Sequence, residues 1–178
     1  AGDLAVVFAF RNGSPTAASL ATGWTNFASD VNVNVSYRIG YKILTAADAD
    51  TGTWTNAVDI QVDVYRGAVS PGAIGTSTKG NNTTLAIPAV TLQIDTGSSW
   101  VLGLYGHDVA TTAHSRTQAG MTTRSSGQAC TNLFAADAAN VTSFAAPAAT
   151  TVNGSGRWIG IALELLVAPF YLEQDFII

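Results

Sequence analysis

Residues 33–43 of the chain read VNVSYRIGYKI, and this stretch decides the fold. Apolar and aromatic residues occupy every second position, while small, polar or basic residues fill the positions between them. Successive side chains of a strand point to opposite faces, so the pattern predicts a half-buried strand of an antiparallel sheet. The residues expected to face the core are Val33, Val35, Tyr37, Ile39, Tyr41 and Ile43.

The same alternation recurs twice further along the chain. Residues 58–64 alternate valine and isoleucine with Asp59, Gln61 and Asp63, and residues 159–165 place isoleucine and leucine at odd positions. Shorter strands are predicted at 4–10, 85–87, 90–94 and 100–105. Clusters of Gly, Pro, Asn and Ser predict turns at 11–15, 70–75, 79–82 and 153–156. The sequence therefore predicts an all-β chain of antiparallel type.

Three pairs of similar segments indicate that the chain consists of two related halves. The pairs are 3–10 with 99–106, 46–49 with 135–138, and 58–68 with 158–168. Their order is the same in both halves, which chance explains poorly. We therefore predict one domain over residues 1–168, with halves at 1–78 and 79–168. It would be an antiparallel β-sandwich of jelly-roll type with about eight strands.

Composition narrows the classes of function. The 178 residues suffice for one domain, and only 11% are charged, against roughly 25% in typical soluble domains. A free soluble protein normally relies on surface charge for solubility, so this low charged fraction favours a protein that is a subunit of an assembly. The eight basic residues are scattered and the net charge is −4, so we expect no nucleic-acid partner. The single cysteine, Cys130, excludes an intrachain disulfide, and we expect neither a membrane partner nor an export signal.

Two Asp-Thr-Gly triplets are the sharpest sign of enzymatic chemistry. Residues 95–100 resemble the active-site signature of pepsin-like aspartic proteases, and a second triplet begins at Asp50. That chemistry needs two carboxylates that share a proton at equivalent positions of two halves. In the internal alignment Asp50 and Asp95 are not equivalent, and Asp and Gly are also preferred in turns. We therefore predict no enzymatic activity, no cofactor and no metal site.

Two tryptophans, Trp24 and Trp54, leave a carbohydrate-binding alternative open. Sugar rings stack on aromatic faces in shallow grooves of β-sandwiches, which makes carbohydrate a candidate ligand. The other interpretation is that both rings plug the ends of the core, and it is favoured because no Asp, Asn and Arg set accompanies them. Exposure of either ring on a concave face would discriminate between the two.

Short motifs spread along the chain resemble a group of β-sandwich proteins from bacteriophage virions. The motifs are Gly2-Asp3-Leu4, Gly23-Trp24-Thr25, the Ala-Asp-rich turn after residue 43, and Val64-Tyr65-Arg66-Gly67. The resemblance implies a structural protein of the head decoration, tail or fibre class. We expect a capsid decoration subunit, made in the host cytoplasm and located in the virion. Its partners would be copies of itself and other virion proteins such as the major capsid protein. The alternative is a tail-fibre or receptor-binding module that binds carbohydrate.

The last ten residues are expected to form an assembly arm. Pro169 ends the last predicted strand because proline has no amide proton to donate. The apolar residues that follow are Phe170, Tyr171, Leu172, Phe176, Ile177 and Ile178. Burying each large side chain is worth roughly 1.5–3 kcal/mol, so the segment should be covered. We predict that residues 169–178 pack on a neighbouring subunit; the alternative is that they cover their own sheet edge.

Overall fold

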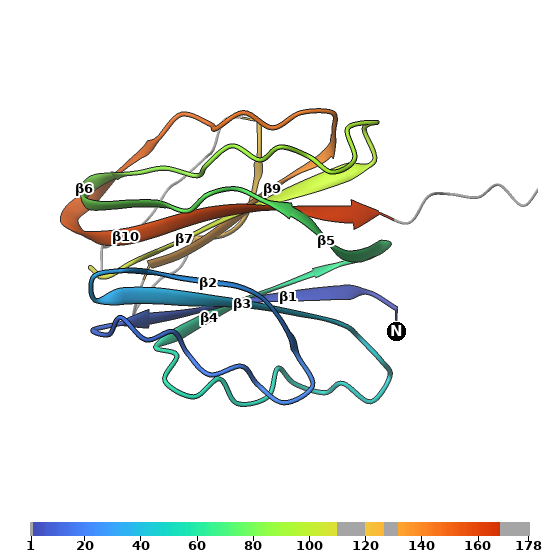
Figure 1. Cartoon of the computed structure of the whole chain (residues 1–178), viewed down its shortest axis with the longest axis horizontal. Coiled ribbons are helices and arrows are strands. Elements are labelled where there is room, and N and C mark those ends of the chain that lie inside the picture. Colours follow the sequence, from blue (N-terminus) through green and yellow to red (C-terminus); the bar gives the residue numbers. More distant parts are fainter. Residues whose placement is uncertain (1, 110–119, 127–131, 168–178) are drawn as a thin grey trace, which may run out of the picture.

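The computed structural model describes residues 2–109, 120–126 and 132–167, and these residues form an antiparallel all-β fold (Figure 1). The strands are β1 (Leu4–Asn12), β2 (Thr25–Asn32), β3 (Val35–Ile43), β4 (Asp59–Tyr65), β5 (Ala68–Ile74), β6 (Thr78–Leu85), β7 (Ser99–His107), β8 (Thr122–Ser126), β9 (Asn132–Val141) and β10 (Thr150–Val167). No helix long and apolar enough to cross a membrane occurs in the described part of the chain.

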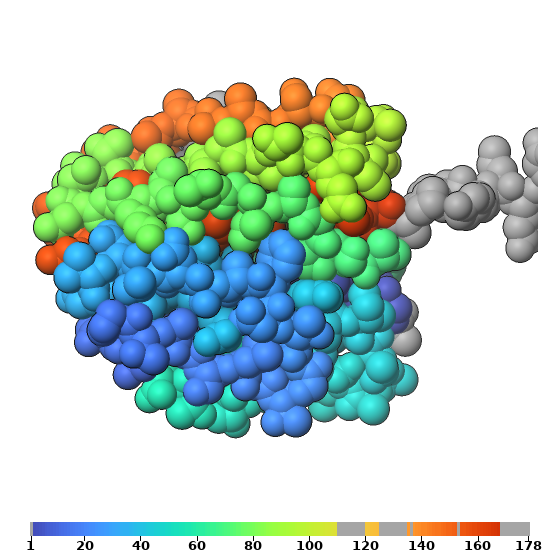
Figure 2. Space-filling view, viewed as in Figure 1, coloured from blue at the N-terminus to red at the C-terminus, as the bar shows by residue number. Residues whose placement is uncertain are grey.

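The strands form two sheets that lie face to face. One sheet has the order β2-β3-β1-β4, and the other has the order β8-β9-β7-β10 with β5 and β6 both paired to the far edge of β10. Every strand pair is antiparallel. In Figure 2 the N-terminal residues, coloured blue to cyan, make up the lower part of the molecule and later residues the upper part.

The strand alternation in residues 33–43 is confirmed over most of its length. Val35, Tyr37 and Ile39 are almost fully buried between the sheets, in the main core cluster. Val33 instead lies in the turn before β3, with a φ of 56°, and its side chain is exposed. Strand β3 therefore begins one alternation later than predicted. At its other end the prediction for Ile43 is wrong, because this side chain is 42% exposed.

The prediction that segments 58–64 and 159–165 occupy equivalent places is confirmed by the strand register. Leu4 pairs with Tyr65 between β1 and β4, and Trp100 pairs with Leu165 between β7 and β10. The pairs at the other ends are Phe10 with Asp59 and Gly106 with Ile159. In the packing of the sheets, β1 lies against β7, β3 against β10 and β4 against β9. Exchanging β1–β4 with β7–β10 maps this set of three contacts onto itself, so the two units match in strand order and in these contacts.

Three details of the predicted organisation need correction. The equivalent units are β1–β4 and β7–β10, with β5 and β6 as additional strands, so the predicted boundary at residues 78 and 79 falls just where β6 begins. The similar segments 46–49 and 135–138 do not occupy equivalent places, because the first follows β3 and the second lies within β9. Jelly-roll connectivity is not confirmed, since each four-strand unit has the order 4-1-3-2 and a Greek key has 4-1-2-3.

The described residues form ten strands where about eight were predicted, and β5 and β6 cover most of the segments 70–75 and 79–82 that were interpreted as turns. The predicted strands at 85–87 and 90–94 are wrong, since Leu85 ends β6 and Val90 forms only an isolated bridge. Glycine, proline and asparagine are poor strand formers, which is why this region looked irregular. Both strands lie along the edge of β10, and an edge strand tolerates proline because one side of it needs no hydrogen-bonding partner.

The predicted buried face of β4 is wrong. Val58, Ile60 and Val64 are 49%, 36% and 53% exposed. The pairing of β4 with β1 places Asp63 opposite Val6, whose side chain lies in the core, so the odd-numbered residues of β4 point inward. Polar side chains thus enter the edge of the sandwich, while an apolar strip faces outward.

Candidate functional site

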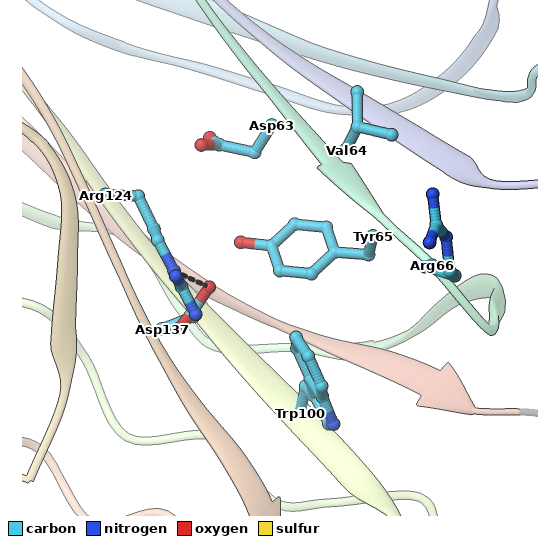
Figure 3. A pocket seen from close by; sticks show the side chains of 7 residues that line it. All are labelled: Asp63, Val64, Tyr65, Arg66, Trp100, Arg124 and Asp137. Atoms are coloured by element: carbon cyan, nitrogen blue, oxygen red, sulfur yellow. Dashed lines mark hydrogen bonds and ion pairs between the residues drawn. The ribbon is translucent and has the colours of Figure 1, made fainter.

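A cavity of about 270 Å³ opens at the edge of the sandwich where β4 passes over β7, β8 and β9 (Figure 3). It is named here the edge cavity. Its lining residues are Asp63, Val64, Tyr65, Arg66, Trp100, Arg124 and Asp137. The cavity exists because the odd-numbered side chains of β4 face inward, toward the second sheet. Asp137 reaches it from β9, where it pairs with the core residue Leu102.

An ion pair fixes the floor of the edge cavity. The Nε of Arg124 donates a hydrogen bond of 2.7 Å to Oδ2 of Asp137, whose side chain is only 2% exposed. This hydrogen bond is the main reason why the pKa of Arg124 is raised above its ordinary value. Arg124 lies at a register shift between β8 and β9, which turns its side chain toward Asp137.

Asp63 lies on the opposite wall of the cavity, in surroundings that disfavour its charged form. Burial raises its pKa to about 6; a hydrogen bond from Gln61 opposes the shift, and the charge of Asp137 adds to it. The Gln61 Nε2 donates to Oδ1 of Asp63 over 3.1 Å. Among the described residues no cationic group lies within 4.0 Å of this carboxylate. At neutral pH the protein therefore holds an ionised carboxylate at a cost in stability.

Two aromatic rings close the cavity. Tyr65 and Trp100 meet edge to face, with their centroids 5.5 Å apart at an interplanar angle of 89°. Tyr65 is 4% exposed, and its buried hydroxyl lies close to the Asp137 carboxylate without a hydrogen bond of ordinary geometry to any described residue. Burial raises the pKa of this phenol, and the nearby Asp63 and Asp137 raise it further, so the hydroxyl keeps its proton and can donate it.

Replacing Asp63 by asparagine should stabilise the protein in a pH-dependent manner. Because folding raises the pKa of this carboxyl from 3.8 to about 6, the protonated carboxyl favours the folded state. This contribution to stability is complete below pH 3.8 and is lost as the pH rises through 6. Asp63→Asn should be close to wild type near pH 4 and exceed it at pH 8 by about 2 kcal/mol, which is less than the roughly 3 kcal/mol of the full shift because solvent screens this half-buried group. Urea unfolding at both pH values measures this, with the exposed Asp95→Asn as the control. A gain of equal size at both pH values would contradict the assignment.

The structure buries both tryptophans that were considered for glycan stacking. Trp24 and Trp54 are 7% and 6% exposed, and they pack against each other edge to face in a cluster that covers the outer side of β1. Trp54 also covers Gly40, where a Cβ would lie 2.5 Å from its ring. Rings buried to this degree offer too little surface to a sugar. Both tryptophans are packing residues, but they cover the outer side of the first sheet instead of plugging the ends of the core between the sheets.

The two Asp-Thr-Gly triplets lie on opposite outer sides of the sandwich. Asp50 borders a pocket with Ala5 and Trp24 outside the first sheet. Asp95 borders a pocket with Val90 and Phe144 outside the second sheet. The Oδ1 of Asp50 accepts a hydrogen bond from the Gly52 amide, as expected for a turn. The structure thus places these two carboxylates in separate surroundings rather than in one cleft.

Several predicted residues lie outside the described part of the chain. These are Cys130 and the arm residues Phe170, Tyr171, Leu172, Phe176, Ile177 and Ile178. Within the described residues no group of three or more His, Cys, Asp or Glu side chains could hold a metal ion.

Sequence reasoning missed the edge cavity, although signals for it were present. Asp63 belongs to the polar half of an alternating strand, and that half was assigned to solvent. Asp137 stands in an Ala-rich run that resembled a turn but lies in β9. The Val64-Tyr65-Arg66-Gly67 motif was noted only for its family resemblance. None of these residues is a neighbour of Trp100 or Arg124 in sequence, so the set could not be assembled without the fold.

Known proteins add no assignment to this cavity. Comparisons of the chain with protein-family models, with curated proteins and with solved structures find no match. The function must therefore be argued from the residues that the structure brings together.

Proposed function

We propose that this protein is a structural subunit of a bacteriophage virion, by preference a capsid decoration subunit. It would assemble through contacts with copies of itself and with other virion proteins such as the major capsid protein. The observation that carries the proposal is an apolar edge of β4 that pairs with no second strand among the described residues. The low charge of 11% and the motif resemblance to virion β-sandwich proteins support the same role.

The matching strand orders of the two units support this edge as the place where a further strand would add. β10, the equivalent of β4, carries β5 and β6 along its outer edge, whereas β4 ends its sheet within the described residues. An unpaired edge presents N–H and C=O groups that can pair with another strand. We call this edge, together with the exposed side chains of Val58, Ile60 and Val64, the β4 edge.

The other sheet edges are less suited to pairing. β5 contains Pro71 and Gly72, and β2 and β8 consist mostly of polar residues. Two β4 strands would also pair poorly with each other, because Asp59 and Asp63 of one copy would approach those of the next. The partner strand is therefore a different segment, and the apolar residues 169–178 of a neighbouring copy have the chemistry to match the apolar strip.

Removing either member of this contact should abolish self-assembly. Truncation after Ala168 and the charge substitution Ile60→Lys should each give folded monomers, because the first removes the arm and the second places a lysine on the β4 edge. Ile74→Lys is the matched control, since it alters an equally exposed isoleucine on the edge strand β5. Sedimentation measurements over a range of concentrations report the mass, and negative-stain images show particles or free subunits.

Three results would contradict the assembly role. The first is a wild-type protein that stays monomeric at every concentration. The second is assembly of the truncated chain or of Ile60→Lys as in wild type. The third is loss of assembly in Ile74→Lys as well, which would show that the effect is not specific to the β4 edge. Thermal unfolding confirms that each variant is folded before its mass is interpreted.

A further inference from the structure

The edge cavity holds polar groups that the fold itself does not satisfy. Among the described residues, the buried Tyr65 hydroxyl has no hydrogen bond of ordinary geometry although Asp137 lies nearby, and the half-buried Asp63 carboxyl receives one, from Gln61. Buried polar groups in native proteins normally have partners, so such a pair in one cavity indicates that a ligand or water completes the set. Figure 3 shows both groups directed into the same space as Arg124 and Asp137.

The walls of the cavity are held in place before any ligand arrives. The Tyr65 ring packs edge to face on Trp100, and the Arg124 guanidinium holds the nearly buried Asp137. Side chains fixed in this way lose little conformational freedom on binding, which favours recognition. Trp100 is partly buried against the core, and part of its indole borders the cavity.

The chemistry of the lining restricts the ligand. Two acidic side chains, Asp63 and Asp137, are balanced by two basic ones, Arg66 and Arg124, so no excess charge attracts an anion or a cation. Carboxylates accept hydrogen bonds, guanidinium groups donate them, and a phenol does both. A ligand that suits this lining is neutral, carries several hydroxyl groups and presents an apolar face to an aromatic ring.

The size of the cavity points to a small ligand. Pockets for drug-sized molecules occupy roughly 300–1,000 Å³, and this cavity of about 270 Å³ lies below that range. It would accommodate one sugar ring, with the remainder of a glycan extending into solvent. We propose that the edge cavity binds one neutral sugar residue of a glycan, with Trp100 as the aromatic wall and Tyr65, Asp63 and Asp137 as hydrogen-bonding partners.

This glycan site goes beyond the assembly role and does not depend on it. Its lining residues Asp63 and Tyr65 lie on the inner side of β4, whereas Val58 and Ile60 of the β4 edge lie on the outer side and do not line the cavity. Val64 borders both surfaces and is therefore left unchanged in the tests of each. The site also differs from the one expected at Trp24 and Trp54, because it combines a partly exposed tryptophan with acidic and basic side chains. Acidic and basic side chains of this kind could fix a sugar in place, and the sequence shows no such set around Trp24 and Trp54.

The test uses the full chain on an array of immobilised neutral mono- and oligosaccharides, with sialylated and sulfated glycans as a charged set. A neutral glycan found in this way is then titrated while tryptophan fluorescence is recorded. Trp24, Trp54 and Trp158 are almost fully buried, so the change in emission should come mainly from Trp100. Trp100→Ala should abolish binding, and Tyr65→Phe should weaken it about tenfold, since it removes one buried hydrogen-bonding group.

Tyr37→Phe is the matched control, because it removes a hydroxyl at the far side of the core. The Tyr37 hydroxyl is 3.0 Å from Oγ of Ser77, so this variant should lose thermal stability and bind the glycan as wild type does. Tyr65→Phe should show the opposite result, with an unchanged or higher Tm and weaker binding. Ile60→Lys should bind as wild type, which separates glycan binding from assembly.

Four results would overturn the glycan site. These are binding to no neutral glycan, binding to charged glycans alone, unchanged affinity in Tyr65→Phe, and a fall in the Tm of Tyr65→Phe as large as that of Tyr37→Phe. The last result would show that the Tyr65 hydroxyl has a structural partner. Failure of wild type to assemble, with glycan binding intact, would contradict the assembly role alone.

Discussion

Replacing Glu164 by alanine is expected to remove about 4 kcal/mol or more of the free energy of unfolding. Glu164 lies near the C-terminal end of β10 and is fully buried, and four groups donate hydrogen bonds to it. The donors are the amides of Ala73, Gln93 and Ile94, at 3.0, 2.7 and 3.0 Å, and the Ser99 hydroxyl, at 2.5 Å. Hydrogen bonds to a charged group are worth roughly 1.5–3 kcal/mol, and each buried donor left alone costs roughly 1–3 kcal/mol.

This carboxylate joins three separate parts of the chain to β10. Ala73 belongs to β5, Gln93 and Ile94 to the segment before β7, and Ser99 to β7 itself. Loss of the acceptor would release β5 and the 86–98 segment together. An effect above about 4 kcal/mol is exceptional for one substitution and would be a large share of the stability of an ordinary domain.

The stability that Glu164 contributes should also depend on pH. Burial tends to raise its pKa, but the hydrogen bonds from Ser99, Ala73, Gln93 and Ile94 outweigh burial and lower the pKa below 4.5. A lowered folded-state pKa contributes stability that is present above pH 4.5 and is lost as the pH falls through the folded-state value. Wild type should therefore lose this contribution in acid, whereas Glu164→Ala lacks it at every pH.

Urea unfolding of Glu164→Ala, Glu164→Gln and the exposed control Asp95→Asn measures these effects. Glu164→Gln keeps the shape but turns an amide donor toward existing donors, so it should cost about 2–3 kcal/mol. Asp95→Asn should change stability by less than about 0.5 kcal/mol. A cost below about 1 kcal/mol for Glu164→Ala would contradict a structural role for this carboxylate.

Gly160→Ala is expected to cost about 3 kcal/mol or to prevent folding. A Cβ at this position of β10 would lie 2.1 Å from the Ala86 carbonyl oxygen and 2.8 Å from the Thr78 hydroxyl. Thr78 Oγ1 donates a hydrogen bond of 2.5 Å to that same carbonyl, which fixes it in place. Leu85 and Ile87 on either side of Ala86 are fully buried, so this backbone cannot move away without disturbing the core.

Gly13→Ala separates this clash from the general cost of replacing a glycine. Gly13 has a φ of 80° and open space around its Cα, so alanine there meets conformational strain alone, at roughly 1–2 kcal/mol. Thermal and urea unfolding of both variants give the comparison. Equal losses in the two variants would show that the 86–87 segment does not approach β10 as closely as the structure has it.

The sequence by itself determined strands β1, β3, β4, β7 and the second half of β10, together with the similarity between β4 and β10. The alternation around Tyr37 identified β3, and the similarity of 58–68 to 158–168 identified equivalent strands whose registers agree between the sheets. These features are encoded locally, because period-two alternation follows from the geometry of one strand and repeated segments reproduce the same pairing.

Only the tertiary structure decided which face of β4 points inward and which residues meet at its edge. Alternation divides a strand into two faces but does not say which of them meets the core; the register with β1 decides this, and it turned Asp63 inward. The edge cavity joins Asp63, Trp100 and Asp137 from three strands, and Glu164 binds donors up to 91 residues away. Such groups are brought together by sheet packing, which depends on the whole chain rather than on any local segment.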